Sequence, residues 1–516
     1  MRIHTLSLIL LITWLPLCSQ EMLELSLKKK VDPEKAEYQE SSEESANNKV
    51  HLSIEQCLNQ LLDNSLMIKA NKLSPKIKEQ DAKSSLNKFK SVGSISAIHE
   101  ETNLPSDFIF DGTTKVKRKN STLAFQIDKT WESGTETSLS WGRNRNESNT
   151  TFNKINPAYG DEFALEISHP LFQGSGKRIQ RADYEQAKNL QAMADLDYLM
   201  DMEARLLQVY YDYWQLALSI WENRLNQERL ELAQEESSLQ QSLFDQQRST
   251  ELQLDISHQK EAYARRNMEL SEANIRKALW TLKSQLLSED ILNEAELEII
   301  PVSPIMPFES LHLGSLKECQ KIAINHRLEL KQKSLFIANS EVKLLVAKDI
   351  QRPSVDLIGR GAFTALEKKY LKGFGKVIGA DYPSWQIGVN VSFFLDRQTR
   401  KSQLQSAILS HQQIGYQKEA LLIEITKDIA IAQESLLQIG SRLKELDSRI
   451  QIVSKNLQSV QASLKQGRLT PLDELKAQLE LSENHWLRQQ LLVSYHLSHA
   501  QYLASQGILL KTWLGE

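Results

Sequence analysis

Hydrophobic residues between positions 422 and 464 recur at alternating spacings of three and four residues without a break. This spacing is the seam of a coiled coil, in which one stripe of a helix packs against another helix. A helix predicted over 401–465 would be roughly 100 Å long at about 1.5 Å per residue. Such a helix outgrows a globular core and has to pack lengthwise against other helices. The seam residues are Leu422, Ile425, Ile429, Ala432, Leu436, Ile439, Leu443, Leu446, Ile450, Val453, Leu457, Val460 and Leu464.

A tight turn follows the seam. Gly467 is typical of the end of a helix, and Thr470 followed by Pro471 is typical of the start of the next one. We therefore expect a second helix to run back along the first.

Composition agrees with long helices. Of the 516 residues, 41% are hydrophobic and 25% are charged, and the chain has 19 Gly and 12 Pro. Low Gly and Pro content and an abundance of helix-forming polar residues favour helices over several compact domains. A net charge of -4, without a continuous Lys and Arg stripe, predicts no binding to nucleic acid. No nucleophile–base pair or metal constellation stands at a recognisable spacing, so we predict neither an enzyme nor a cofactor.

The N-terminus predicts export. An apolar run over 6–17 follows Arg2, and it is short for a membrane span but typical of a signal-peptide core. We expect a signal peptide over 1–19. No later stretch approaches about 18 apolar residues, so a membrane-embedded part would consist of strands.

Cys18 leaves an alternative open. Residues 15–18 resemble a bacterial lipobox, but Leu17 stands where a small residue normally precedes the lipidated Cys. Lipidation of Cys18 is therefore an alternative to simple cleavage near Ser19.

The chain contains an internal duplication. Residues 53–57 align with 315–319 at an offset of 262, and the register continues through 66–69 against 328–331. Further along, 247–252 aligns with 467–472 at an offset of 220. The difference between the offsets leaves 42 additional residues in the first copy. The expected organisation is a polar segment over 20–50, a first repeat over 51–288, a linker over 289–314, a second repeat over 315–510 and a tail over 511–516.

Each repeat is predicted to read helix, strands, long helix, turn, helix. In the second repeat, apolar residues at odd positions 385–393 alternate with polar or small ones, the pattern of a half-buried strand. Its expected partner is 355–363, with Asp356 and Arg360 on the polar face. In the first repeat Phe163, Leu165 and Ile167 alternate similarly, and 92–98 matches more weakly. The lengths suit tilted membrane-barrel strands with apolar side chains toward lipid.

The additional residues predict an extra hairpin near 121–145. Two strand-like stretches, 123–127 and 137–141, are separated by a turn signal over 132–135. The sequence leaves open whether this hairpin lines the barrel or stands above it.

Taken together, the repeat plan resembles the outer-membrane efflux protein family, the TolC-like channels. The supporting segments are ISHPLFQGSGKR at 167–178, VSFFLDRQTR at 391–400 and QGRLTPLDELKAQ at 466–478. The resemblance implies a mainly α fold with a membrane β-barrel portion. It implies a homotrimer in which each protomer adds four strands to one shared outer-membrane β-barrel and its helices to a periplasmic α-helical tunnel.

The resemblance also implies a function. Such proteins are the outer-membrane channel component of a tripartite efflux or type I secretion system, a passive export duct across the periplasm and outer membrane. They receive substrate from an inner-membrane pump or ABC exporter through a periplasmic adaptor protein. The expected partners are therefore two further copies, that adaptor, the pump and outer-membrane lipid.

An oligomer also follows from strand number. Four strands are too few to close a membrane barrel, which needs about eight, and open edges in lipid leave backbone groups unsatisfied. The alternative function, a structural coiled-coil envelope lipoprotein that tethers envelope layers, has no use for repeated amphipathic strands.

Site residues follow from the resemblance. The turns between paired helices form the adaptor-contacting tip, and acidic residues beyond the second turn constrict the pore. Asp473 matches the constriction, Glu474 stands beside it, and Lys476 occupies a position that is often acidic in the family. The tip residues would be Gln247, Arg248, Thr250, Gly467, Arg468, Leu469 and Thr470.

We expect a single Asp473 ring, paired with Lys476 or Arg468, whose carboxylates resist full ionisation because like charges lie close together. The alternative is an ordinary first-turn carboxylate favoured by the helix dipole. Gln247 replaces the Gly of the second turn, which leaves the geometry of the first turn open.

The remaining candidates favour structural roles. Cys57 and Cys319 occupy equivalent repeat positions and are expected to be small buried hydrophobic residues rather than a disulfide. His496 and His499 have helical spacing but no third ligand, so no metal site is expected. Aromatic residues near strand ends suit an interfacial belt, with core packing as the alternative. They are Trp131, Trp141, Tyr159, Tyr382 and Trp385.

Overall fold

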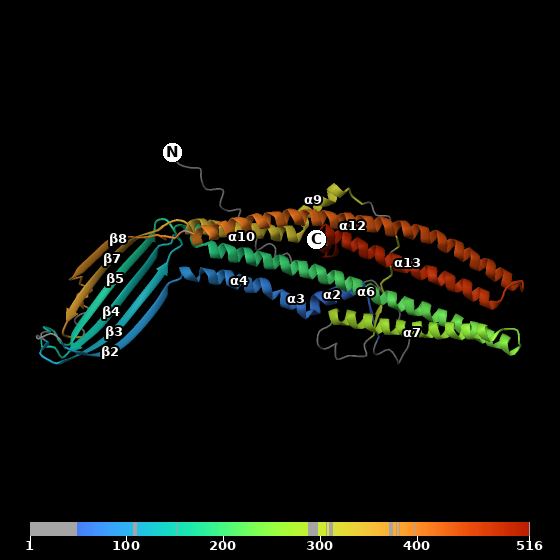
Figure 1. Ribbon diagram of the computed structural model, residues 1–516, viewed down its shortest axis with the longest axis horizontal. Helices are drawn as coiled ribbons and strands as arrows, with labels where there is room; N and C mark the ends of the chain where they lie inside the picture. Colours follow the sequence, from blue (N-terminus) through green and yellow to red (C-terminus); the bar gives the residue numbers. More distant parts are fainter. Residues whose placement is uncertain are drawn as a thin grey trace, which may run out of the picture. The chain divides into compact units, whose positions relative to one another are not determined.

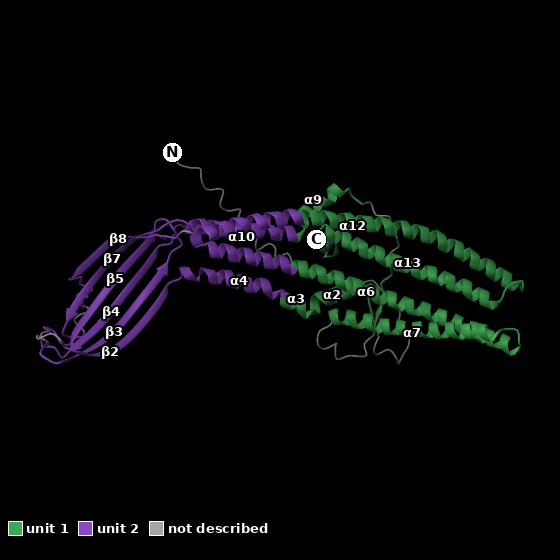
Figure 2. Cartoon of the chain, viewed as in Figure 1, with its two compact units in different colours: residues 1–70, 199–328, 421–516 green, residues 71–198, 329–420 purple. Residues whose placement is uncertain are grey.

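The computed structural model describes residues 49–106, 111–151, 153–286, 298–305, 307–308, 313–370, 375–377, 379–380, 382–396 and 398–514. The predicted signal peptide, Cys18 and most of the polar segment lie outside these residues. The chain divides into two compact units, shown in Figure 2. Unit 1 comprises 1–70, 199–328 and 421–516, and unit 2 comprises 71–198 and 329–420. None of the described helices has the length and apolar content needed to cross a bilayer.

The elements follow the predicted repeat plan (Figure 1). The elements up to the end of the first repeat are β1 (Lys49–Leu52), α2 (Ile54–Asn64), α3 (Leu66–Asn71), α4 (Leu73–Ser85), η1 (Leu86–Phe89), β2 (Val92–Pro105), β3 (Lys115–Thr130), β4 (Glu136–Ser148), β5 (Ala158–Pro170), α5 (Lys177–Gln180), α6 (Ala182–Asp245) and α7 (Glu251–Leu286). The elements from the inter-repeat linker onward are β6 (Glu298–Pro301), α9 (Leu316–His326), α10 (Leu328–Ile350), β7 (Ser354–Glu367), β8 (Pro383–Ser392), α12 (Gln398–Lys465), α13 (Pro471–Ser505) and α14 (Leu509–Leu514).

The duplication extends to the helix caps. Ser53 and Gln56 form a reciprocal capping box at the start of α2, with N–H to side-chain oxygen distances of 2.8 and 3.2 Å. Ser315 and Glu318 do the same at the start of α9, at 2.9 and 3.4 Å. Each box satisfies two backbone N–H groups that a helix leaves unpaired at its start. Both helices have 11 residues, so the offset of 262 describes structure as well as sequence.

The segments expected to be linkers contribute a small sheet to unit 1. Lys49 pairs with Glu298 and Leu52 with Pro301 in the parallel pair β1 and β6. The Tyr213 hydroxyl donates to the Leu52 carbonyl (3.0 Å) and accepts from the Ser303 N–H (2.9 Å). These two strands lie at the end of the predicted polar segment 20–50 and within the predicted linker 289–314, and the sequence does not indicate them because four residues are too few to show a period-2 pattern.

The predicted seam is confirmed on α12. Every seam residue from 422 to 464 is buried or half-buried. Two polar contacts accompany the seam where α12 packs against α13 in unit 1. Arg488 Nε lies 2.6 Å from Asp447 Oδ1, and Gln461 Nε2 donates to Glu474 Oε1 at 3.0 Å. In unit 1, α12 and α13 thus pack lengthwise, as the sequence predicts.

The two turns between paired helices have the same geometry. Gln247 has a φ of 58° and Gly467 a φ of 70°. The N–H of Arg248 donates to the Leu243 carbonyl (2.8 Å), and the N–H of Arg468 donates to the Ser463 carbonyl (3.0 Å). This is the Schellman motif, which ends a helix through one left-handed residue. Gln247 therefore adopts the conformation that Gly467 adopts without steric cost.

Unit 2 contains one six-stranded sheet in the order β2-β3-β4-β5-β7-β8, with every neighbouring pair antiparallel. The extra hairpin is confirmed as β3 and β4, and it lies between β2 and β5 within the sheet. Its turn closes through the Trp131 N–H to the Thr135 carbonyl (2.7 Å), with Gly134 at a φ of 92°. The sheet therefore has six strands rather than the four that the family resemblance implies for each protomer, because the added residues pair along their length with β2 and β5.

Ile429 is fully buried on the α12 seam, whereas Glu434 lies on the exposed side of the same helix. We expect Ile429→Ala to lower the free energy of unfolding by about 2–5 kcal/mol, because it removes buried methyl groups and leaves a cavity. Glu434→Ala should change it by less than about 0.5 kcal/mol. Guanidinium unfolding followed by circular dichroism measures both. Equal small effects would show that the seam does not support the fold.

Gln247 offers a second test. Gln247→Gly should raise the free energy of unfolding by roughly 0.5–1 kcal/mol, because a left-handed conformation strains a residue with a Cβ but not glycine. The reciprocal Gly467→Gln should lower it by a similar amount. Destabilisation by Gln247→Gly, measured in the same unfolding experiment, would contradict the assigned turn geometry.

Candidate functional site

One face of the sheet is apolar and exposed. A row of paired residues on this face crosses five strands: Ile95, Phe125, Trp141, Phe163 and Phe363. Exposure is highest on β8, where Trp385 is 80% and Ile387 72% accessible. Exposed apolar patches of this kind mark contact with a membrane or another protein. The apolar face also includes Leu123, Ile127, Leu139, Leu165, Ile167, Leu357, Trp385, Ile387, Val389 and Val391.

The opposite face is polar. Gln126 and Ser140 pair across β3 and β4 on this face, and Glu162 forms an ion pair with Arg360 across β5 and β7. Asp356 and Arg360 lie on this face as predicted, because they pair with Asn390 and Gln386. The period-2 assignment of the strands is therefore confirmed, except that Phe393 lies just beyond the end of β8.

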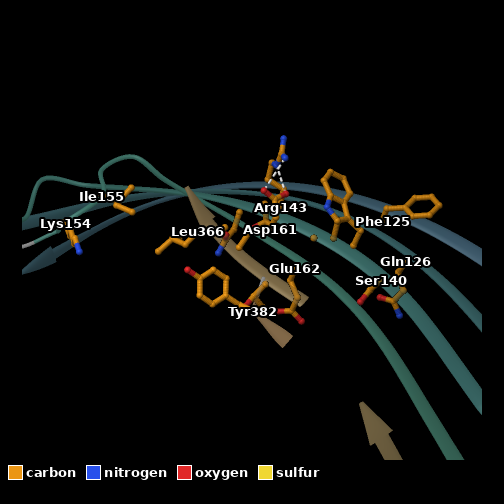
Figure 3. A pocket seen from close by; sticks show the side chains of 18 residues that line it. Phe125, Gln126, Ser140, Arg143, Lys154, Ile155, Asp161, Glu162, Leu366 and Tyr382 are labelled. Carbon is orange, nitrogen blue, oxygen red and sulfur yellow. Dashed lines mark hydrogen bonds and ion pairs between the residues drawn. The ribbon is translucent and has the colours of Figure 1, made fainter. Parts of the chain in front are cut away.

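A hollow of about 970 Å³ lies over the polar face (Figure 3). In Figure 3 Ser140, Glu162 and Tyr382 lie on one side of the strands, and the Arg143 side chain lies on the other. Lys154 and Tyr382 come from the loops after β4 and β7, so loop residues contribute to the lining. Residues from four strands and two loops thus line a water-accessible space on the polar side.

An ion pair that sequence reasoning missed lies at one end of the apolar face. Arg143 Nε is 2.7 Å from Asp161 Oδ1, and Arg143 Nη2 is 3.2 Å from Asp161 Oδ2. Both residues are buried, and the Tyr370 ring lies 4.5 Å from Arg143 Cζ. Opposite charges directly across two strands compensate each other, and an aromatic cover removes them from solvent. The sequence does carry a signal for this pair, because Arg143 on β4 and Asp161 on β5 each interrupt the alternation of apolar residues on their strand.

Trp131 and Tyr159, two of the aromatic residues expected in an interfacial belt, lie toward opposite strand ends. Trp131 is in the turn between β3 and β4, with Lys129 Nζ 4.2 Å from its ring. Tyr159 is near the opposite end, where its ring contacts Tyr370 edge to face at 5.6 Å. Trp141 belongs to the apolar row instead. The belt stays a prediction that these positions permit.

The two helical turns carry equivalent caps. The Thr470 N–H and hydroxyl donate to Asp473 Oδ2 at 2.9 and 2.7 Å. At the equivalent place in the first repeat, the Thr250 N–H donates to Gln253 Oε1 at 3.2 Å. A neutral Gln therefore fills in one repeat the capping role that Asp473 fills in the other. The predicted tip residues Gln247, Arg248, Thr250, Gly467, Arg468 and Thr470 are exposed, and Leu469 is half-buried.

The surroundings of Asp473 within one chain favour its ionised form. Hydrogen bonds from the backbone and side chain of Thr470, together with the nearby charge of Lys476, lower the pKa of Asp473. The resistance to ionisation expected of three Asp473 carboxylates in a ring, and their pairing with Lys476 or Arg468, stay predictions. In the chain, Lys476 Nζ also lies 2.9 Å from Glu236 Oε1 of α6.

Glu236 links three helices of unit 1. Its carboxylate forms an ion pair with Lys476 of α13 at 2.9 Å and a longer one with Lys260 of α7 at 3.4 Å. Burial raises the pKa of Glu236, but the hydrogen bond from Lys476 and both lysine charges outweigh burial, and the pKa is lowered overall. Arg229 and Glu483 form a further link between α6 and α13 at 2.9 Å. Lys476 therefore joins helices, in addition to any role at the tip.

Cys57 and Cys319 are free and buried, as expected for small hydrophobic residues. Burial raises the pKa of Cys57 to about 12, so it remains a thiol. Burial and the neighbouring His496 lower the pKa of His499. Within the part of the chain that the structure describes, no three His, Cys, Asp or Glu side chains are grouped to hold a metal ion.

No family model and no curated protein sequence matches this chain. Several solved structures match the structure of this chain. The Campylobacter jejuni CmeC outer membrane channel matches with a TM-score of 0.64 at 13% identity, over 88% of this chain and 86% of that one. The outer-membrane channel OprN matches with a TM-score of 0.63 at 15% identity, over 88% and 89%.

The Vibrio cholerae outer membrane protein VceC matches with a TM-score of 0.59 at 14% identity, over 88% of this chain and 96% of that one. The similar structures are thus outer-membrane channels rather than enzymes, and at these identities the likeness concerns the fold. The fold of this chain is that of the TolC-like outer-membrane efflux channels.

Proposed function

We propose that this protein is an outer-membrane channel of an efflux or secretion system, a passive duct whose substrate is driven by energy spent at the inner membrane. The observation that carries the proposal is the two-faced sheet. Its apolar face is exposed from β2 to β8, and its polar face lines a water-accessible hollow. A sheet of this kind suits lipid on one side and a lumen on the other.

The sheet edges support an oligomer. Among the described strands, β2 and β8 each have a neighbour on one side only. Unpaired edges in lipid leave backbone N–H and C=O groups unsatisfied, so neighbouring copies have to pair them. Because the six strands alternate in direction, β8 of one copy and β2 of the next run antiparallel. Three copies closing one ring is the arrangement that the family resemblance implies.

The helical turns support an adaptor contact. Both turns lie at the same end of unit 1 (Figure 1), and each presents an exposed Arg next to its left-handed residue. We assign this end to the periplasm, where it would meet an adaptor protein linked to an inner-membrane pump or ABC exporter. The predicted signal peptide agrees with export to that compartment.

A matched pair of substitutions tests the membrane assignment. Ile387 lies on the apolar face of β8, and its neighbour Gln386 lies on the polar face. Ile387→Arg should strongly reduce integration into liposomes, because an arginine facing lipid near the bilayer centre costs about 2–4 kcal/mol per copy. Gln386→Arg should integrate like the wild type. Flotation of reconstituted protein on a density gradient measures both.

The assembled state gives an independent check. In mild detergent, light scattering with the detergent mass subtracted should give a trimer, and the same protein should conduct ions in planar bilayers. A monodisperse monomer without conductance, together with equal flotation of the two arginine variants, would overturn the channel. That result would favour the envelope tether.

The pore constriction at Asp473, Glu474 and Lys476 stays a proposal. If Asp473 from three copies lines the pore, Asp473→Asn should reduce cation selectivity and weaken block by multivalent cations. Asn keeps an acceptor oxygen for Thr470, so the cap survives while the charge is lost. Lys476→Ala should act in the opposite direction, because it removes a positive charge and releases Glu236. Wild-type selectivity and block in Asp473→Asn would leave Asp473 as a helix cap alone.

A further inference from the structure

The added hairpin is a complete part of the sheet. β3 pairs with β2 from Val92 to Pro105, and β4 pairs with β5 from Glu136 to Asn146. Its strands of 16 and 13 residues exceed the roughly 9–11 residues that a tilted strand needs to cross a bilayer. The hairpin therefore has the length and the pairing of a membrane strand pair.

We infer that the hairpin forms part of the channel wall, so that each copy contributes six strands and a ring of three copies closes with eighteen. This inference rests on the proposed channel function, and it makes the barrel wider than a barrel of twelve strands. A ring built from the four remaining strands per copy would close with twelve.

The position of the apolar side chains carries the inference. The paired row that starts at Ile95 on β2 passes through Phe125, Trp141 and Phe163 and reaches Pro383 on β8. On β2 this row runs through the middle of the apolar stretch. On β8 the apolar stretch is 385–391, and its middle lies five residues beyond Pro383. The apolar band therefore crosses the sheet diagonally.

This diagonal is the one that tilted strands require. There are five steps between neighbouring strands from β2 to β8. Over these steps the middle of the apolar stretch moves five residues along the strands, or about one residue per step. With a rise of about 3.3 Å per residue and about 4.8 Å between strands, the displacement corresponds to a tilt of roughly 35°. Strands in closed barrels tilt by about 35–45°. A flat apolar layer such as a bilayer then fits the band.

The hairpin lies on the same diagonal. Leu123, Phe125 and Ile127 of β3 and Leu139 and Trp141 of β4 fill the band between β2 and β5 without a gap. Beyond the band on the apolar face of β4 comes Arg143, neutralised by Asp161 and covered by Tyr370. A hairpin standing above the membrane would have no reason to continue the apolar band of its neighbours.

The consequence is a wider lumen. At a tilt of about 35° and a spacing of about 4.8 Å, eighteen strands give a barrel diameter of roughly 34 Å, against roughly 22 Å for twelve. Thr122, Gln126, Ser140 and Asn144 of the hairpin line the hollow with uncharged polar groups. Arg118, Asp128 and Glu136 stand nearer the strand ends on the same face. The hairpin therefore enlarges the barrel with a hydrophilic wall.

Single cysteines test the inference, in a protein whose Cys57 and Cys319 are changed to Ala. Leu123→Cys and Gln126→Cys probe the two faces of β3, Leu139→Cys and Ser140→Cys those of β4, and Ile387→Cys and Gln386→Cys those of β8. Each is labelled with bimane in liposomes and quenched by brominated lipid or by aqueous iodide. We expect lipid quenching to be at least severalfold stronger at the three leucine and isoleucine positions than at their polar neighbours.

The β8 pair separates this inference from the proposed function. If β8 shows the contrast while the β3 and β4 positions are all quenched by iodide alone, the hairpin lies outside the membrane and the inference falls. If β8 shows no contrast, the channel assignment itself falls.

Excision of the hairpin gives a second test. Because β2 is antiparallel to β5, deleting 107–154 leaves two strands able to pair directly. Electron cryo-microscopy of the trimer should show a barrel about one third narrower than that of the full chain. An unchanged barrel diameter would overturn the inference, and if the deletion fails to assemble, the cysteine experiment decides alone.

Discussion

Lengthwise burial of a narrow apolar stripe is the interaction on which the helical part of this protein depends. The α12 seam buries Ile425, Ile429, Leu436 and Leu443 in turn, and each is largely removed from solvent by helices that run alongside. Stability is therefore distributed along the helices, with ion pairs such as Arg488 to Asp447 fixing the register of one helix against another.

Much of the fold could be predicted from the sequence because its patterns are long. The seam, the repeat plan and the amphipathic strands each extend over enough residues for periodicity to stand out. Short or exceptional features could not be foreseen. The β1 and β6 strands are four residues each, and Gln247 enters a left-handed conformation that residue type alone does not suggest. The Arg143 and Asp161 pair depends on a register between strands that the sequence does not encode locally.

The candidate constriction shows how a structural role and a functional role can share one residue. Asp473 caps α13 through Thr470, and Gln253 performs the same task for α7 without a charge. Capping therefore explains an acceptor at both positions, but it does not explain why one of them is acidic. The excess of negative charge at the second turn is the part of the pattern that a pore would use. Lys476 forms an ion pair with Glu236 at 2.9 Å, and its charge also acts on Asp473.

The position of the β3 and β4 hairpin has a consequence for how this sheet could have grown. β5 leads through α5 into α6, so its direction decides on which side of the sheet the long helix begins. One inserted strand would reverse the direction of β5, and α6 would then begin at the opposite end of the sheet. Two inserted strands restore the direction and leave everything downstream in place. Enlargement in whole hairpins is thus the smallest change that the connectivity tolerates.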